Sequence, residues 1–319
     1  MALKEPFMIK TALDLGAGES VELTAKTGES LLVKDVIING SNDEYCVLEV
    51  EKTTVGFFRV DGHVLGSHLS CPRALFSGFH YLRGVRTGGS ITLISYMINK
   101  GWMRGYPVAE GQTFRVKPFT SGKKLNDVAI VYEKYDAGDI KATDFNGSEA
   151  KEYIFVNYGR PSENLTASKD YPINTCVTTE EFPDFPFGEP VSSKTTIEIL
   201  GILGTEALKY TDANNYVYTE FLKMFRGRTC LFDRDKQGLP FYQPILSGIS
   251  SGTHFGKGFS VIGNYSSIDR REPFLPPSPL VFSAGAEVGV YVTTQAKGSD
   301  SLDKKYVEIG FIEKVTITE

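Results

Sequence analysis

The chain has 319 residues, a net charge of −5 and 41% hydrophobic residues. This length fits one large domain or two of ordinary size, and the composition excludes an intrinsically disordered chain. The acidic balance argues against a protein that coats nucleic acid, because affinity for phosphate backbones comes from Lys and Arg. The 32 Gly residues and the 12% aromatic share are typical of a turn-rich β protein.

The sequence indicates neither a secretory signal, nor a membrane-spanning helix, nor a set of disulfide bonds. Residues 1–16 contain no apolar stretch of signal-peptide length, and no run in the chain approaches the ~18 apolar residues that span a bilayer. The four cysteines are far apart, at Cys46, Cys71, Cys176 and Cys230. Four cysteines in a chain of this length do not form a disulfide framework, so we expect reduced, mostly buried thiols and folding in a cytoplasm.

Apolar runs with strand spacing recur along most of the chain. They fall at residues 21–23, 30–38, 46–50, 55–60, 91–98, 128–132, 288–292 and 307–311. The turn dipeptides Asn39-Gly40 and Asp61-Gly62 close two of these runs. Short strands that alternate with turn residues predict antiparallel sandwiches or barrels.

Two segments have helical spacing instead. The first runs from Pro72 to Gly84, and the second spans residues 214–226 with Asp212 as its cap and Gly227 as its stop. One helix in each half is too few for repeated strand–helix–strand units, so a parallel α/β sheet is excluded.

The sequence also contains an internal repeat. Residues 79–87 and 222–229 share an apolar pair followed by Arg-Gly, and residues 108–116 resemble residues 282–290 around a central glycine. The repeat predicts that Gly84 is equivalent to Gly227, and Gly111 to Gly285. We therefore expect two similar domains, residues 1–140 and residues 141–319, each an antiparallel sandwich with one helix.

The second half carries a long insertion at residues 233–279. From Gly84 to Gly111 there are 27 positions, whereas from Gly227 to Gly285 there are 58. The insertion contains six Gly and six Pro, which disfavour a continuous helix or a central strand. A loop of this length is usually functional, so we expect it to project on the face opposite the chain termini and to carry partner contacts.

Several short motifs resemble catalytic or metal sites, but each lacks its structural context. Residues 13–19 resemble a methyltransferase glycine loop, yet a strand-like segment and not a helix follows. Residues 248–252 match a nucleophile elbow without the helix that the elbow requires. Residues 233–238 resemble a calcium loop whose twelfth position is Pro244 instead of a glutamate.

Two residue clusters complete the search for chemistry. A zinc set could be drawn from Cys46, His63, His68 and Cys71, but no Cys-x-x-Cys pair anchors it. The basic residues Arg83, Arg86 and Arg104 are too sparse for a nucleic-acid groove. We therefore predict no catalytic, cofactor-binding or metal-binding residue, no cofactor, and a protein that is not an enzyme.

Four features of the sequence resemble those of a known family. These are the repeated sandwich, the two Arg-Gly helix ends, the two Gly-centred strand pairs and the Pro-rich segment Phe274–Leu280. In these features the sequence resembles double jelly-roll major capsid proteins. The nearest comparison is with the turreted viruses of archaea. The resemblance implies a homotrimer of pseudo-hexagonal outline that tiles an icosahedral shell, in a virion made in the host cytoplasm. The partners it implies are further copies of the chain, minor capsid proteins and an internal membrane, without sequence-specific nucleic-acid binding. One departure is that residues 314–319 are typical of a strand, where those proteins extend into a helix near the membrane.

Two other classes of protein fit parts of the pattern. A carbohydrate-binding or receptor-binding β-sandwich, such as an adhesin or a viral spike, would use the aromatic loop residues Phe241, Tyr242, Phe255, Phe259 and Tyr265. A bicupin enzyme is also a duplicated jelly roll, but the four His residues of this chain are not spaced as a metal set. The capsid interpretation remains the principal expectation.

Overall fold

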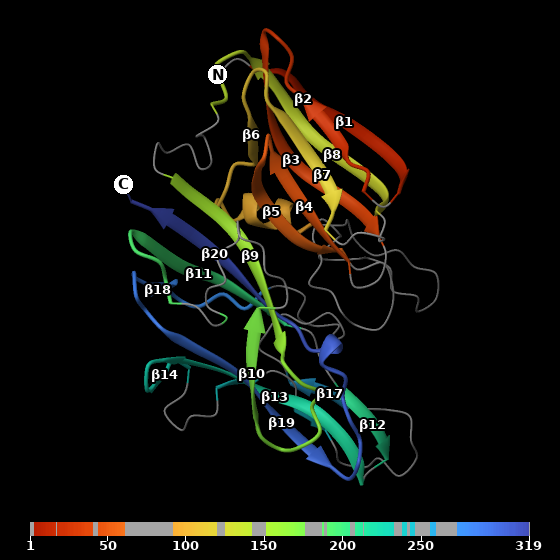
Figure 1. The fold of residues 1–319 in the computed structure, drawn as a ribbon, viewed down its shortest axis with the longest axis vertical. Helices are drawn as coiled ribbons and strands as arrows, with labels where there is room; N and C mark the ends of the chain where they lie inside the picture. The colour runs from red at the N-terminus through yellow and green to blue at the C-terminus, as the bar shows by residue number, and fades with distance from the viewer. Residues whose placement is uncertain are drawn as a thin grey trace. The chain divides into compact units, whose positions relative to one another are not determined.

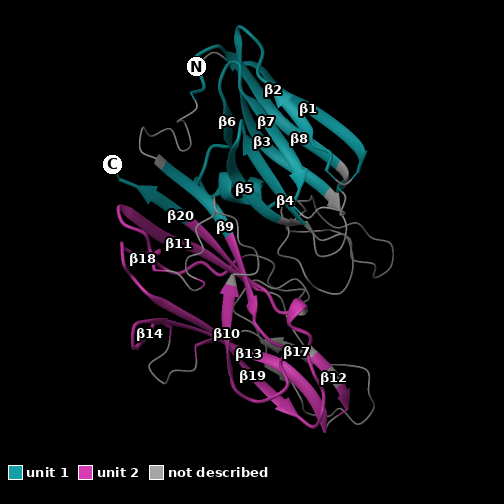
Figure 2. Cartoon of the chain, viewed as in Figure 1, with its two compact units in different colours: residues 1–64, 69–156, 314–319 teal, residues 65–68, 157–313 magenta. Residues whose placement is uncertain are grey.

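The computed structural model is mainly β, and every strand pairing with a described register is antiparallel. The structure describes residues 3–16, 18–40, 44–60, 92–119, 125–141, 151–175, 187, 190–204, 208–212, 214–232, 238–240, 243–245, 256–259 and 273–318. The chain divides into two compact units (Figures 1 and 2). Unit 1 comprises Met1–Val64, Leu69–Val156 and Lys314–Glu319, and unit 2 comprises Leu65–His68 and Asn157–Glu313.

Unit 1 contains two four-stranded sheets. The first sheet has the order β1 (Leu3–Leu15), β8 (Leu125–Asp136), β3 (Glu29–Gly40), β6 (Tyr106–Val108). The second has the order β2 (Val21–Thr24), β7 (Thr113–Pro118), β4 (Glu44–Val50), β5 (Thr53–Val60). The pairings are nested, because β1 pairs with β8, β2 with β7, β3 with β6 and β4 with β5. This is the path of one long antiparallel hairpin folded over on itself.

Rows of apolar side chains build the core of unit 1. Val116 of β7 lies in register with Val21 on one side and Leu48 on the other, and all three are buried. Tyr106 of β6 and Phe114 of β7 bring the two sheets together, with ring centroids 5.9 Å apart. The strands predicted at residues 21–23 and 46–50 are confirmed as β2 and β4. Alternate residues of β2 and of β7 face this core.

The apolar run at residues 91–98 was expected to be a strand, and that prediction is wrong. Residues Leu93–Asn99 form helix α1, with Thr92 as its N-cap. The Thr92 side chain accepts a hydrogen bond from the Ser95 amide at 3.0 Å, and the hydroxyls of Thr92 and Ser95 both donate to Asp35 of β3. Helix and strand cannot be told apart from a short continuous apolar run, and here the cap and the Asp35 anchor decide for the helix.

Unit 2 is built on one ten-stranded sheet path. Its members in spatial order are β12 (Leu208–Asp212), β13 (Asn215–Arg226), β19 (Val288–Lys297), β10 (Asp170–Thr175), β9 (Lys151–Pro161), β20 (Ile309–Ile317), β11 (Thr195–Gly204) and β18 (Leu280–Phe282). The short strands β14 (Thr229–Cys230) and β15 (Leu239–Pro240) pair with β13. The start of β9 and the end of β20 are counted with unit 1.

The nested order of unit 1 recurs in unit 2. Strand β9 neighbours β20, β10 pairs with β19, β11 with β18, and β13 with β14 and β15. Strand β10 also pairs with β9, which joins the two groups of strands into one path. At the end of β13, the Arg226 guanidinium lies 4.9 Å from the ring centroid of Phe282 in β18 and donates to the Val281 carbonyl at 2.7 Å.

The helix expected at residues 214–226 is strand β13, which pairs along its length with β19. A β-bulge between Thr219 and Phe221 shifts the register, so the buried apolar residues are Val217, Leu222 and Met224. Spacings that the bulge makes irregular resembled helical spacing in the sequence. The prediction of one helix in each half is therefore wrong: among the described residues the single α-helix is α1, in unit 1. The segment 72–84 lies outside the described residues.

The turns around Gly111 and Gly285 are equivalent in strand order and in hydrogen bonding. The Gly111 amide donates to the Ala25 carbonyl at 2.9 Å, and the Gly285 amide donates to the Val191 carbonyl at 2.7 Å. In return, the Ala25 amide donates to Gln112 and the Val191 amide donates to Ala286. Both glycines have left-handed φ values, +81° and +76°. The short sequence match therefore marks the same turn in both units, whereas Gly84 lies outside the described residues.

The insertion at residues 233–279 is described only in parts. After β15, the strands β16 (Gln243–Ile245) and β17 (Gly256–Phe259) pair with each other, and Phe274 exchanges two backbone hydrogen bonds with Ile202 of β11. A short 3₁₀ helix, η1 (Lys304–Tyr306), precedes β20. The expected direction of the insertion depends on residues outside the described parts.

Candidate functional site

Unit 1 exposes a row of apolar side chains on strand β1. Phe7 is 65% exposed, Ile9 49% and Leu13 73%, and they alternate with residues of the opposite face. Ile9 lies in register with Val131 of β8, and Ala129 of β8 lies in register with Ile37 of β3, which is 47% exposed. We call this surface the apolar face; its residues are Phe7, Ile9, Leu13, Ile37, Ala129 and Val131.

The opposite face of the same strands forms the core of the unit. Val128 and Ile130 of β8 lie opposite Ile38 and Val36 of β3, and all four are at most 2% exposed. A sheet that is apolar on both faces is typical of a sheet that packs on both sides. Large exposed apolar patches on soluble proteins mark interaction sites, so the apolar face is a candidate assembly surface.

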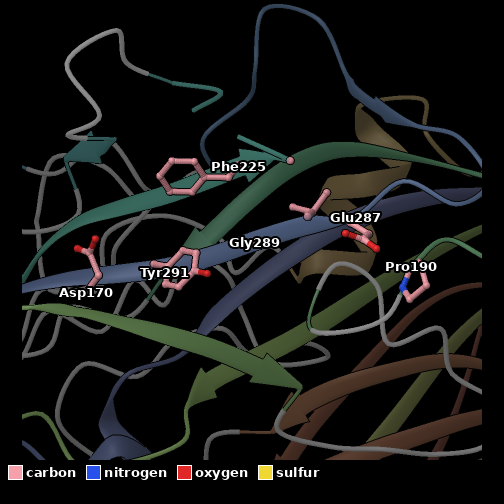
Figure 3. Close-up of a pocket in the computed structure, with 8 residues that line it drawn as sticks. Asp170, Pro190, Phe225, Glu287, Gly289 and Tyr291 are labelled. Atoms are coloured by element: carbon pink, nitrogen blue, oxygen red, sulfur yellow. The ribbon is translucent and has the colours of Figure 1, made fainter. Parts of the chain in front are cut away.

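Unit 2 contains a groove with a volume of about 560 Å³. Its lining residues come from β10, β13, β19 and the connections near them: Asp170, Pro190, Phe225, Gly227, Glu287, Val288, Gly289 and Tyr291. Figure 3 shows the Phe225 ring above the Tyr291 ring, with Asp170 on one side of the two rings and Glu287 and Pro190 on the other. The two ring centroids are 5.8 Å apart and the ring planes make an angle of 82°.

Strand register explains why the groove is open at its centre. Phe225 of β13 lies opposite Gly289 of β19, which has no side chain to cover the ring. A Cβ atom at Gly289 would lie 2.9 Å from Cε2 of Tyr291, so the glycine also makes room for that ring. Asp170 closes one end, where its carboxylate accepts hydrogen bonds from Lys223 at 2.9 and 3.0 Å and from the Thr293 hydroxyl at 2.6 Å.

Unit 2 also buries two carboxyl groups near the start of β20. Glu308 is fully buried and pairs with Arg160 at 2.7 Å. Glu313 is fully buried, and one of its oxygens accepts a hydrogen bond from the Asn157 amide at 2.8 Å. Burial raises the pKa of Glu313 well above its ordinary value, and the hydrogen bond from Asn157 offsets only part of this effect. Glu313 belongs to β20, a strand that contributes none of the described residues lining the groove.

The motifs that resembled chemical sites are not brought together in the described part of the chain. Residues 13–15 end strand β1 and Val21–Thr24 is strand β2, which confirms that a strand, not a helix, follows the methyltransferase-like glycines. Cys46 is buried in β4, whereas His63, His68 and Cys71 lie outside the described residues. The segment 248–252 also lies outside them, and of the calcium-like loop only Gly238 is described. Within the described ranges, no group of three or more His, Cys, Asp and Glu could hold a metal ion.

Of the other residues singled out in the sequence, the structure describes some but not all. Cys46 and Cys230 are thiols, the first buried and the second half-buried, while Cys71 and Cys176 fall outside the described residues. Of the aromatic loop residues, only Phe259 is described, at the end of β17. Arg83 and Arg86 are likewise not described.

Sequence reasoning missed both the apolar face and the groove. The alternation of Phe7, Ile9 and Leu13 is a visible strand signal, but it shows only that one face is apolar, not that this face is exposed. The groove residues come from three strands separated by more than 50 positions in the chain, from Asp170 to Phe225 to Tyr291. No local pattern could have brought them together.

Comparison with protein-family models and with curated protein sequences finds no match for the chain. No helix in the described ranges combines the length and the apolar character that crossing a membrane requires. The case for a function therefore depends on architecture and surfaces.

Proposed function

We propose that the chain is a shell-forming structural protein, the major capsid protein of an icosahedral virus, which assembles through pseudo-hexagonal homotrimers. The observation that carries the proposal is the nested strand order, present in unit 1 and again in unit 2. Eight strands in this order define a jelly roll, an architecture common to viral capsid proteins, lectins and cupins. Two of them in tandem on one chain make a double jelly roll.

Duplication gives this architecture its value for a shell. Three copies around a threefold axis present six similar units, and a six-sided block tiles a surface with few kinds of contact. The equivalent turns at Gly111 and Gly285 support a common origin of the two units. The expectation that the protein is not an enzyme belongs to the same proposal.

The apolar face supports self-association. Obligate interfaces between subunits are larger and more apolar than transient ones. Leu13 at 73% exposure and Ile37 at 47% would leave water when a second copy covers the face. The proposed occupant is therefore another copy of this chain.

Light scattering after size-exclusion chromatography, with negative-stain microscopy, tests the proposal. We expect trimers or closed shells for the wild type and monomers for Ile37→Asp, because the buried charge opposes assembly. Val281→Asp is the matched control: Val281 is 46% exposed and lies on β18 of unit 2, outside the apolar face. It should assemble as the wild type does.

A wild type that stays monomeric at all concentrations and salt conditions would overturn the proposed function. An Ile37→Asp variant that assembles normally would instead remove the role of the apolar face. Far-UV circular dichroism on each variant separates loss of assembly from loss of folding.

A further inference from the structure

The groove on unit 2 has the dimensions of a site for a small ligand. Its volume of about 560 Å³ falls within the range of roughly 300–1,000 Å³ typical of such sites. We propose that this groove binds a neutral carbohydrate, with a sugar ring placed against Phe225 and Tyr291 and its hydroxyls directed to Asp170 and Glu287. The proposal is independent of shell formation, because every described lining residue belongs to a single unit of one chain.

The aromatic pair supplies the apolar part of the site. A pyranose has a face of C–H groups that packs on an aromatic ring, while its hydroxyls point outward from the ring edge. Phe225 and Tyr291 are each half-buried, so their rings are held by the sheet but remain open to the groove. Their edge-to-face arrangement fixes one ring relative to the other, which lowers the entropy lost when a ligand orders them.

Gly289 supplies the space. The strand register places Gly289 opposite Phe225. A Cβ atom added at Gly289 would contact the Tyr291 ring, so any larger residue must displace that ring. Glycine is disfavoured in strand interiors, where it adds no packing and costs backbone entropy. A glycine between two half-buried aromatic residues is what a site for close ligand approach requires.

The polar groups favour a neutral ligand over a cation. The Asp170 carboxylate is paired with Lys223, whose side chain is only 15% exposed, so its charge is already matched within the protein. The Asp170 side chain is still 43% exposed, which leaves carboxylate lone pairs for ligand hydroxyls. Glu287, at the other end of the groove, is exposed and adds a second acceptor.

Saturation-transfer NMR with a panel of methyl glycosides tests the site. The probes are methyl α-mannoside, methyl β-galactoside, methyl β-glucoside and methyl β-N-acetylglucosaminide, with lysine methyl ester as the cationic comparison. We expect at least one glycoside to bind the wild type and to bind Tyr291→Ala about tenfold more weakly, the change expected when one aromatic contact is lost. Gly289→Ala should weaken binding as well, because the added methyl group displaces the Tyr291 ring from its position.

Tyr216→Ala is the matched control. Tyr216 is also half-buried and aromatic, lies on β13 and stacks on Tyr218 at 5.9 Å, but does not line the groove. This variant should bind the glycoside as the wild type does. Three results would overturn the proposal: no glycoside binds the wild type, lysine methyl ester alone binds, or Tyr291→Ala leaves glycoside affinity unchanged. None of these results depends on the oligomeric state, so they are distinguishable from failure of the capsid proposal.

Discussion

Strand β8 of unit 1 and strand β20 of unit 2 hold the same place in their sheets, beside the first strand of the unit, yet their surroundings differ. In β8, buried Val128 and Ile130 alternate with partly exposed Ala129 and Val131. In β20, residues 309–313 are all buried, including Glu313. The same strand order therefore supports a strand with one partly exposed face in unit 1 and a strand buried on both faces over residues 309–313 in unit 2.

The enclosure in unit 2 includes a segment of its own chain. Phe274 and Ile202 exchange backbone hydrogen bonds, and Pro273 and Leu275 lie near Gly201 and Ile312. In unit 1, the corresponding strands β1 and β3 keep Leu13 and Ile37 exposed. One unit therefore completes its core with a segment of its own chain, whereas the other leaves Leu13 and Ile37 in contact with solvent, where the proposed second copy would bind.

The largest expected effects on stability come from one glycine in each unit that lies too close to a backbone carbonyl to accept a side chain. A Cβ at Gly105 in unit 1 would lie 2.5 Å from the Val33 carbonyl oxygen, and one at Gly238 in unit 2 would lie 2.3 Å from that of Leu222. Both glycines have positive φ, +136° and +97°. Gly105→Ala and Gly238→Ala should each cost about 3 kcal/mol, because a backbone oxygen cannot move aside cheaply.

Urea denaturation with two probes shows which unit each glycine supports. The single tryptophan, Trp102, lies in unit 1 against Tyr96, so its fluorescence reports that unit, whereas circular dichroism reports both. Gly105→Ala should shift the fluorescence transition to lower urea, and Gly238→Ala should shift only the circular dichroism. Equal shifts of both signals in both variants would show that the units unfold as one and would end the comparison of independent units.

The next effect concerns the buried carboxyl of β20. Because the pKa of Glu313 in the folded state is raised above its ordinary value of 4.5, the folded state keeps a proton that the unfolded state releases. The stability that this proton contributes is complete below pH 4.5 and falls as pH rises through the raised pKa, by up to about 1.4 kcal/mol per pH unit. Glu313→Gln keeps a neutral polar group beside Asn157, so its melting temperature should depend less on pH above 4.5.

Glu29→Gln in unit 1 is the control of opposite sign. The hydrogen bond from Lys134 lowers the pKa of Glu29, so its contribution is present above its ordinary pKa and is lost as pH falls. This variant should alter only the acid side of the stability profile. Burial also raises the pKa of Asp35, so Asp35 contributes to the pH dependence of stability in the same direction as Glu313. This contribution is the same in the wild type and in Glu313→Gln, so it cancels in their difference. An unchanged slope in Glu313→Gln would show that Glu313 does not carry the pH dependence.

Much of the β architecture was predictable because it depends on local alternation. Val21 and Val116 lie between polar neighbours, and the structure places them with Leu48 in one core row. The errors fell where local spacing was ambiguous. The bulge in β13 produced helix-like spacing, and the run at residues 91–98 needed the distant Asp35 to become a helix.

The candidate surfaces were less accessible to sequence reasoning. Exposure of Leu13 depends on what the rest of the chain leaves uncovered, which no alternation pattern contains. The groove requires Phe225 to lie opposite Gly289, a pairing set by the register between β13 and β19. The glycine turn at residues 111 and 285 was accessible because its requirement is local: a left-handed φ at one position.

The smallest predicted effect compares a second pair of equivalent turns. It tests whether a left-handed φ has the same energetic cost in both units. Gly28 and Lys194 hold equivalent places, three residues after Ala25 and Val191, the partners of the turns at Gly111 and Gly285. Both have a left-handed φ, +82° and +63°. In the first turn the Glu29 amide donates to the Lys26 carbonyl, and in the second the Thr195 amide donates to the Ser192 carbonyl. Gly28 has open space around its virtual Cβ, so Gly28→Ala changes only backbone strain, at about 1 kcal/mol.

The corresponding measurement in unit 2 compares Lys194→Gly with Lys194→Ala. Both variants remove the lysine side chain and its interactions, so their difference isolates the backbone preference at this position. Lys194→Gly should be the more stable of the two by about 1 kcal/mol, the same increment that separates wild type from Gly28→Ala. Urea midpoints from Trp102 fluorescence give the increment for unit 1. The circular dichroism transition reports both units, and it gives the increment for unit 2 because the Lys194 variants leave unit 1 unchanged. A Lys194→Ala variant as stable as Lys194→Gly would mean that the turn relaxes out of the left-handed region, and the two turns would then be alike in hydrogen bonding but not in strain.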